Sequence, residues 1–220
     1  MDNFQYHENL EGLCQTCSNY GYATFKTISE LITRDCTSTS RQSVLHNMVS
    51  LSQRYIKKDY EDNLQVEADG TVLHNSCISH CLKKAFGECK EEHNYVCDEC
   101  ILPMQLIDQL REVVKEEALP KVDILESKIY YWIAHQARKK YLTAQFNAAL
   151  RNLTSEGAIL LCDYKMKVNP RKSRETKQDW FGKRGWSLHT IFVIRNLEYD
   201  KSQLNIQAFD HWSDDTTQNA

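Results

Sequence analysis

Cysteine and histidine residues are concentrated in one short segment of this chain. The segment holds five of the nine cysteines and two of the eight histidines, namely Cys77, His80, Cys81, Cys89, His93, Cys97 and Cys100. Thiolates and imidazoles at this density are typical of structural zinc sites. We therefore predict a metal site in this segment, with structural zinc as the cofactor.

Two C-x-x-C pairs give the most specific candidate ligands. Cys97 and Cys100 form one pair, a spacing that lets both thiolates bind one ion from a tight turn. Cys89 and His93 lie just upstream, so a run of four suitable ligands ends at Cys100. The second pair stands near the start of the chain, at Cys14 and Cys17. It either joins the later cluster across the fold or forms a second site with Cys36, Cys77 or Cys81, and the sequence leaves both alternatives open.

Ordinary burial is the competing interpretation for some of these residues, because free cysteine is among the most buried residue types. Cys77, His80 and Cys81 have the spacing of one face of a short helix, so they could equally be plain helix residues. Redox chemistry at a C-x-x-C pair normally needs a thioredoxin-like βαβ pattern. The sequence shows no such pattern.

Length and composition indicate an ordinary globular protein of one large or two small domains, with 220 residues, 41% hydrophobic and 26% charged. The formal net charge of -3 gives no overall signature of nucleic-acid binding. The start of the chain has no signal-peptide pattern and the cysteine count is odd, which predicts a reduced intracellular protein. No apolar stretch approaches the roughly 20 residues that span a bilayer, so we expect no membrane insertion.

The chain reads as an α+β protein with three zones. We expect a mainly helical Cys/His-rich module over residues 1–103, in which only short helical patterns are visible, and a helical connector over 104–156. Leu106, Ile107 and Leu110 begin a helical stripe in the connector, and Pro120 should divide it into two helices. Residues 157–220 switch to strand patterning.

Three strands are expected in the last zone. The apolar run 158–162 predicts a buried strand that leads into Asp163, and alternation continues the strand to Val168. Further strands are predicted over 188–194 and 204–209, the last followed by Asp210. Their short connections favour an antiparallel meander.

The segment after Asp163 combines positive charge with aromatic residues. It carries eight basic side chains against two carboxylates: Lys165, Lys167, Arg171, Lys172, Arg174, Lys177, Lys183 and Arg184. Trp180, Phe181 and Trp186 lie among them. Such a segment could neutralise phosphates and stack on bases, and a solvated basic hairpin anchored by buried aromatics is the equal alternative.

Three motifs together resemble a known family. They are Leu161-Cys162-Asp163-Tyr164-Lys165-Met166-Lys167, then Phe181-Gly182-Lys183-Arg184-Gly185-Trp186-Ser187-Leu188-His189, then Ala208-Phe209-Asp210-His211-Trp212-Ser213. They resemble eukaryotic, transposon-derived proteins of the DDE transposase type, which have a zinc-binding Cys/His module, a helical region and a ribonuclease H-like catalytic domain. The resemblance implies DNA as partner, a nuclear location, and Asp163 as the first catalytic aspartate.

The resemblance also implies that this chain is catalytically incomplete. The family order is three antiparallel strands, a helix, and a fourth strand with the second acid, whereas this chain ends soon after its third strand. We therefore expect a C-terminally truncated member with an incomplete ribonuclease H-like sheet. One metal ligand of three cannot hold the two magnesium ions of such a site, so magnesium would bind only in a complete domain.

The leading hypothesis from sequence is thus a transposase-derived, zinc-binding fragment that binds DNA without cleaving it. The alternative is a zinc-folded adaptor that binds protein partners and has no nucleic-acid activity. A complete nuclease using Asp163, Asp210 and Asp214 is a third and weaker hypothesis. Self-association is compatible with each of them, because a half-sheet leaves strand edges exposed.

Overall fold

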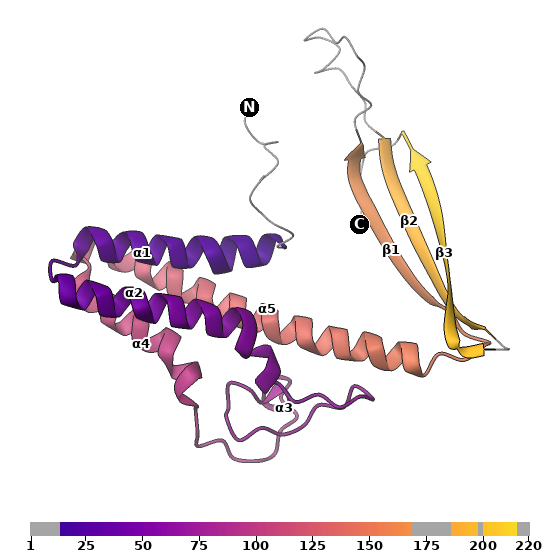
Figure 1. The fold of residues 1–220 in the computed structure, drawn as a ribbon, viewed down its shortest axis with the longest axis horizontal. Coiled ribbons are helices and arrows are strands. Elements are labelled where there is room, and N and C mark those ends of the chain that lie inside the picture. The colour runs from indigo at the N-terminus through magenta and orange to yellow at the C-terminus, as the bar shows by residue number, and fades with distance from the viewer. Residues whose placement is uncertain (1–13, 169–185, 198–199, 215–220) are drawn as a thin grey trace, which may run out of the picture. The chain divides into compact units, whose positions relative to one another are not determined.

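A computed structural model describes residues 14–168, 186–197 and 200–214, and all structural statements below refer to these residues. The chain forms two compact units that meet in sequence at Ala148 and Ala149. The first unit is helical, and the second is a three-stranded antiparallel sheet. Figure 1 shows the elements of each unit. The α+β fold class predicted from the sequence is confirmed.

The first unit consists of helices joined by an irregular segment over residues 64–81 and 86–97. In chain order the helices are η1 (Cys17–Tyr22), α1 (Ala23–Asp35), α2 (Thr39–Arg54), η2 (Tyr55–Asp59), η3 (Glu61–Asn63), α3 (Leu82–Ala85), α4 (Asp98–Val113), η4 (Glu116–Ala118) and α5 (Leu119–Arg151). Helices α1, α2, α4 and the first part of α5 lie side by side (Figure 1). The regular helices α1 and α2 are longer than the short patterns expected in this part of the chain.

Local sequence signals explain where several helices begin. The Ser38 hydroxyl accepts a hydrogen bond from the Arg41 backbone N–H at 3.4 Å and caps α2. Asp98 and Glu99 occupy the first turn of α4, where acidic side chains interact favourably with the helix dipole. Pro120 lies in the first turn of α5, where its missing N–H costs no helical hydrogen bond. The predicted division into two helices near Pro120 is therefore confirmed.

The core of the first unit is contributed by widely separated helices. Leu106, Ile107 and Leu110 of α4 are fully buried, as their helical spacing predicts. The Trp132 side chain of α5 is also fully buried, and its ring lies 5.9 Å from that of Phe25 in an edge-to-face arrangement. The residues expected as a connector thus belong to the first unit up to Ala148, and several of their apolar side chains contribute to its core. No helix in the described ranges is both long and apolar enough to cross a membrane.

The second unit is an antiparallel meander of β1 (Ile159–Val168), β2 (Trp186–Leu197) and β3 (Asp200–Ser213), in the order β1-β2-β3. This is the predicted arrangement. Leu161 pairs with Phe192, which pairs with Ala208, so these three side chains share one face. The neighbouring row, in which Cys162 pairs with Ile191 and Ile191 with Phe209, projects to the opposite face.

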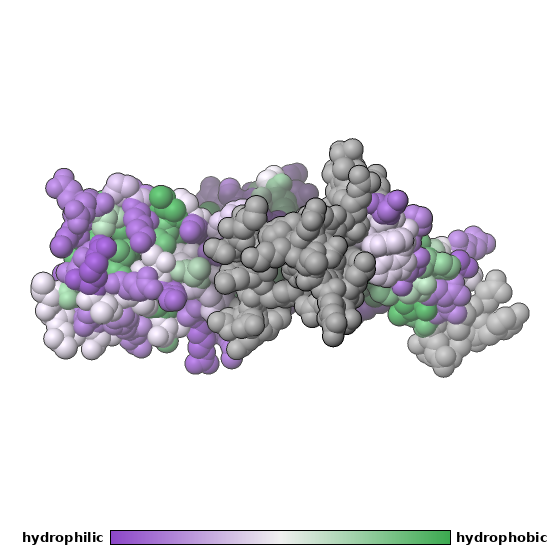
Figure 2. Space-filling model, turned by 90° about the horizontal axis from the view of Figure 1, so that it is seen from above, coloured by the Kyte–Doolittle hydropathy of each residue, from purple (hydrophilic) through white to green (hydrophobic). Residues whose placement is uncertain are grey.

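The expectation of a buried first strand is wrong for the described structure. Leu160 is 59% exposed and Leu161 is 41% exposed, and they project from opposite faces of β1. Trp186, Phe192, Leu204, Ile206, Phe209 and Trp212 are also exposed. Figure 2 shows hydrophobic surface among the strands at the right of the view. The physical reason is that these apolar rows are not covered by a second layer among the described residues.

Candidate metal centres

The more enclosed Cys/His cluster consists of Cys77, His80, Cys97 and Cys100, whose ligand atoms all lie within 4.8 Å of one another. Ligand atoms around a tetrahedral zinc ion are about 3.3–3.8 Å apart, given bond lengths of about 2.0–2.3 Å. Cys97 Sγ lies 3.9 Å from His80 Nδ1, close to this spacing. Four soft ligands at this spacing fit a closed structural metal site.

Backbone hydrogen bonds bring the two halves of this cluster together. The Ile78 N–H donates to the Tyr95 carbonyl at 3.0 Å, within a short parallel bridge between Cys77 and Tyr95. The Cys97 N–H in turn donates to Cys77 Sγ at 3.3 Å. Cys97 is the N-cap of α4 and Cys100 lies in its first turn, so the start of a helix positions both thiols of the C-x-x-C pair.

Tyr55 contacts two members of this cluster through its hydroxyl group. Its hydroxyl lies 2.7 Å from His80 Nε2 and 3.0 Å from Cys100 Sγ. The hydroxyl can accept from an Nε2–H and donate to the sulfur, which leaves Nδ1 of His80 for a metal ion. Metal-binding histidines commonly have their other ring nitrogen held by such a partner.

The electrostatics of the protein groups alone oppose a set of free thiolates. Burial raises the pKa of Cys100 to about 12, and it also raises the pKa of Cys97. Burial opposes ionisation of Cys77 as well, but backbone hydrogen bonds from Cys97 and Ser79 outweigh it and lower the pKa of Cys77. Burial lowers the pKa of His80, which keeps the imidazole neutral as a ligand must be. A divalent cation would allow the remaining thiols to ionise.

The second cluster consists of His74, Cys81, Cys89 and His93, again with ligand atoms within 4.8 Å of one another. His74 Nδ1 lies 3.4 Å from Cys89 Sγ and 3.9 Å from Cys81 Sγ. The other nitrogen of His74 lies 3.3 Å from a carboxylate oxygen of Glu91. A carboxylate behind a histidine is the usual outer partner of a metal-binding imidazole.

His93 supplies the strongest independent indication of metal binding. Both of its ring nitrogens are buried and have no hydrogen-bond partner among the described residues. A buried polar group left without a partner costs about 1–3 kcal/mol. A metal ion bound by one of these nitrogens would remove part of that cost, so the residues present fit a metal at this position.

A tight turn after α3 brings Cys89 back toward Cys81. Cys81 precedes α3, and the helix ends where Gly87 adopts a left-handed conformation at φ 75°. The backbone N–H groups of Glu88 and Cys89 then both donate to the Lys83 carbonyl. Glycine adopts this conformation without the steric cost of a Cβ atom. The turn thus places two cysteines that are eight positions apart in one site.

The two clusters alternate along the chain. His74 belongs to the second cluster, Cys77 and His80 to the first, Cys81 to the second again, and the C-x-x-C pair to the first. His80 and Cys81 are adjacent residues that serve different clusters. The predicted run of Cys89, His93, Cys97 and Cys100 is therefore divided between two sites, because the chain between His93 and Cys97 is not turned and Tyr95 forms the bridge to Cys77.

The pair Cys14 and Cys17 joins neither of these clusters nor Cys36. His135 of α5 is the third member of this group, and the three ligand atoms lie within 4.8 Å of one another. Both alternatives raised from the sequence for this pair are thus replaced. His135 and His74 are ligands that were not predicted from the sequence. His74 lies only three residues before Cys77 and could have been included, whereas His135 stands alone in a helical pattern and gives no local signal.

Asp163 lies within β1 and is exposed. It pairs across the sheet with Thr190, which pairs with Asp210, and the Thr190 hydroxyl donates to Asp210 at 2.6 Å. Asp163 and Asp210 are therefore two strands apart, about 10 Å at the usual strand spacing. Neither belongs to a metal-ligand group within the described ranges, so this arrangement does not favour the three-carboxylate nuclease.

The basic segment lies mostly outside the described residues. Lys165 and Lys167 are part of β1, whereas Arg171, Lys172, Arg174, Lys177, Lys183 and Arg184 fall within the range that the structure does not describe. Their role in binding nucleic acid stays a prediction.

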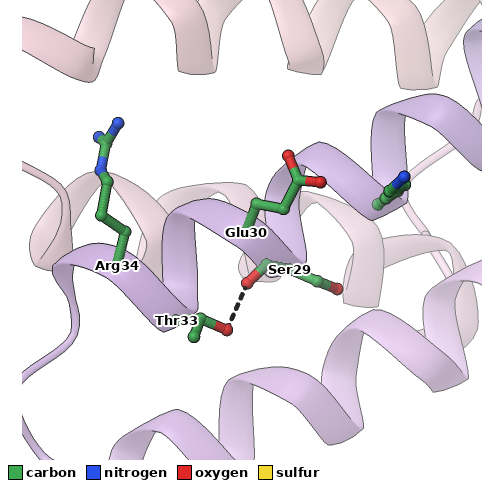
Figure 3. A pocket seen from close by; sticks show the side chains of 5 residues that line it. Ser29, Glu30, Thr33 and Arg34 are labelled. Carbon is green, nitrogen blue, oxygen red and sulfur yellow. Dashed lines mark hydrogen bonds between the residues drawn. The ribbon is translucent and has the colours of Figure 1, made fainter.

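A shallow hollow on α1 is unrelated to the metal centres. It is lined by Lys26, Ser29, Glu30, Thr33 and Arg34, and the Thr33 hydroxyl donates to the Ser29 carbonyl at 2.9 Å (Figure 3). The five residues come from one helix face and include none of the clustered cysteines or histidines. We assign no function to this hollow.

Comparisons with known proteins do not add a family. No family model, no curated protein and no solved structure matches this chain. The Cys/His clusters themselves are therefore the main indication of function.

Proposed function

We propose that this protein is a zinc-folded binding protein, in which two structural zinc ions organise the irregular segment between α2 and α4. The observation that carries this proposal is the pair of interleaved four-residue clusters, Cys77/His80/Cys97/Cys100 and His74/Cys81/Cys89/His93. We assign zinc because mixed sets of four thiolate and imidazole ligands are typical of structural zinc sites. Four protein ligands leave no open position, so these two sites serve the fold and not catalysis.

Metal analysis of separate ligand variants tests this proposal. Protein purified without chelator should contain zinc, and Cys100→Ser and His93→Ala should each lose one equivalent relative to the parent protein. Cys162→Ser is the matched control, because Cys162 lies on the exposed sheet and in neither cluster. A parent protein without bound metal, or variants that keep the full zinc content, would overturn the assignment.

For the partner, we propose DNA, bound through the basic segment from Lys165 to Arg184. The support is the sequence composition of that segment, in which eight basic side chains are accompanied by Trp180 and Phe181 in a chain of net charge -3. The resemblance to transposon-derived proteins points the same way. Phosphate contacts make affinity fall steeply as salt concentration rises.

A salt titration of DNA binding separates this proposal from the protein-binding adaptor. We expect binding to a duplex that weakens strongly between about 50 and 200 mM salt, and a smaller salt slope after replacement of Arg171, Lys172, Arg174 and Lys177 by Gln. Replacement of Lys83, Lys84, Lys121 and Lys128 by Gln removes equal charge from the helical unit and is the control. Absence of DNA binding at low salt would favour the adaptor.

We further propose that DNA binding occurs without strand cleavage. The separation of Asp163 and Asp210 by two strands supports this view, because a two-metal site needs carboxylates that converge within a few ångströms. Magnesium-dependent nicking of DNA that disappears in Asp163→Asn would show that the sheet is catalytic after all.

A further inference from the structure

The third group of metal-ligating side chains differs from the other two in having three members among the described residues. Cys14 Sγ lies 3.3 Å from His135 Nε2, although the two residues are 121 positions apart. The Cys17 backbone N–H donates to Cys14 Sγ at 3.3 Å, so the turn over residues 14–17 holds the two thiols close together. Cys14 is exposed, and Cys17 and His135 are half-buried.

Packing of η1 against α5 holds these three residues in place. His135 stands one turn beyond Trp132, which is fully buried in the core. Gly21 of η1 lies directly against the Trp132 ring, so closely that a Cβ atom added to this glycine would be only 2.6 Å from it. The rings of Tyr20 and Tyr131 are 4.4 Å apart between centroids. The helix η1, which begins at Cys17, is therefore packed on the same face of α5 that carries the histidine.

We propose that Cys14, Cys17 and His135 bind a third zinc ion whose fourth coordination position is open to an exchangeable ligand. Two thiolates and one imidazole are a suitable donor set for zinc, and three protein ligands with one free position distinguish reactive zinc sites from closed structural ones. The exposure of Cys14 gives solvent and small molecules access. The two four-ligand clusters offer no comparable position, because their own side chains complete a tetrahedral set.

The charges around the site do not restrict the fourth ligand to an anion. Lys139 lies one turn beyond His135 and its ammonium group contacts Glu61 at 2.5 Å, and Arg138 lies over the Tyr131 ring. A zinc ion with two thiolates and a neutral imidazole has no net charge, and Glu61 neutralises Lys139, so the surroundings do not require an anionic fourth ligand. Zinc prefers nitrogen and sulfur donors, so we expect a monodentate nitrogen or sulfur ligand, with exogenous imidazole as a convenient probe.

Metal binding at this position would also connect the beginning of η1 to α5. The ion would close a loop of more than a hundred residues, and cross-links over long loops restrict the unfolded chain most. We therefore expect loading of the third site to raise the melting temperature of the helical unit.

Titration of the metal-free, reduced full chain with Co²⁺ tests the inference. Cobalt that is bound by thiolates in a tetrahedral site has a characteristic absorption spectrum. We expect a third equivalent to bind after the first two, to be lost in both Cys14→Ser and His135→Ala, and to change its visible spectrum when imidazole is added. Cys36→Ser and His46→Ala are the controls, since neither residue belongs to a cluster in the described ranges.

The outcomes separate this site from the two structural ones. A third equivalent that persists in His135→Ala, or binding of only two equivalents to the parent protein, would overturn the third site. A third equivalent that ignores imidazole would mean that the chain itself fills the fourth position, and would overturn the open coordination. Loss of the first two equivalents in Cys100→Ser and His93→Ala, measured in the same titration, reports separately on the proposed structural zinc sites.

Discussion

The helical unit buries apolar residues of the same kind that the sheet unit leaves exposed. Ile129 of α5 is fully buried, whereas Ile206 of β3 is 60% exposed. The helical unit folds its apolar stripes against one another and adds Cys/His clusters where its chain is irregular. The sheet presents apolar side chains on both faces. The difference teaches that regular secondary structure alone does not make a core, because a sheet needs a second layer to bury its faces.

Removal of a zinc ligand should produce the largest effect and should be confined to the helical unit. Structural zinc contributes about 10–16 kcal/mol of apparent binding free energy in small zinc-folded peptides near neutral pH. Cys100→Ser should therefore unfold the segment between α2 and α4, seen as loss of zinc and of hydrogen-exchange protection there. Cys162→Ser should change neither. Equal effects of the two substitutions would contradict the assignment of the zinc sites to the helical unit.

Acidification should release zinc in the same unit. Burial opposes ionisation of Cys77 and Cys81, but backbone hydrogen bonds outweigh it and lower the pKa of both thiols. A thiol with a lowered pKa stabilises the folded state above its ordinary pKa, and this contribution is lost as pH falls through the lowered value. Bound zinc extends the stable range further down, until protons compete for the thiolates and imidazoles.

The expected result is cooperative zinc release below about pH 6, where free imidazoles also become protonated. A zinc-sensitive dye and far-UV circular dichroism recorded on the same samples provide the measurement. Zinc release on raising the pH instead would contradict the expected direction of the pH dependence. The strand signal should be unaffected over this range.

A matched pair of truncations measures the contrast between the units directly. Ile129→Ala should cost about 2–5 kcal/mol of unfolding free energy, because it leaves a cavity among fully buried neighbours. Ile206→Ala should change it by no more than about 0.5 kcal/mol, as at other exposed positions. Urea unfolding followed by hydrogen exchange reports both. A large cost at Ile206 would indicate that a further layer covers the sheet in solution.

Gly21→Ala should destabilise the helical unit, but less than Ile129→Ala does. The new Cβ would lie 2.6 Å from Cε2 of the Trp132 ring, so η1 or the ring must move. Overpacking of this kind costs about 1–3 kcal/mol. Gly157→Ala is the control, because its Cβ would meet only ordinary contacts. A stability unchanged in Gly21→Ala would contradict the close packing of η1 on α5.

Sequence patterns predicted the elements of this protein better than their partners. The stripe of Leu106, Ile107 and Leu110 and the division near Pro120 are confirmed, since periodicity and proline chemistry act over a few residues. The three strands and their antiparallel order also follow from short connections. The exposure of Leu160 could not be predicted, because an apolar run reports the hydrophobicity of a strand and not the presence of a layer above it.

The metal clusters show the same limit. The C-x-x-C pair of Cys97 and Cys100 enters a single cluster, as its spacing suggests. The neighbouring pair of Cys89 and His93 enters another, because the parallel bridge from Cys77 to Tyr95 directs the chain back to the first cluster. Sequence spacing predicts which ligands within one turn bind together. The division of ligands between two sites depends instead on backbone hydrogen bonds across about twenty residues.

The sequence by itself determined the supply of ligands, the helical stripes and the strand alternation, all of which arise from neighbours within one or two turns. Only the tertiary structure decided that His80 and its neighbour Cys81 serve different clusters, and that His135 meets Cys14 from the far end of the helical unit. The physical reason is that such contacts depend on how whole helices pack and where the chain turns. That packing is a property of the folded unit and of no single segment.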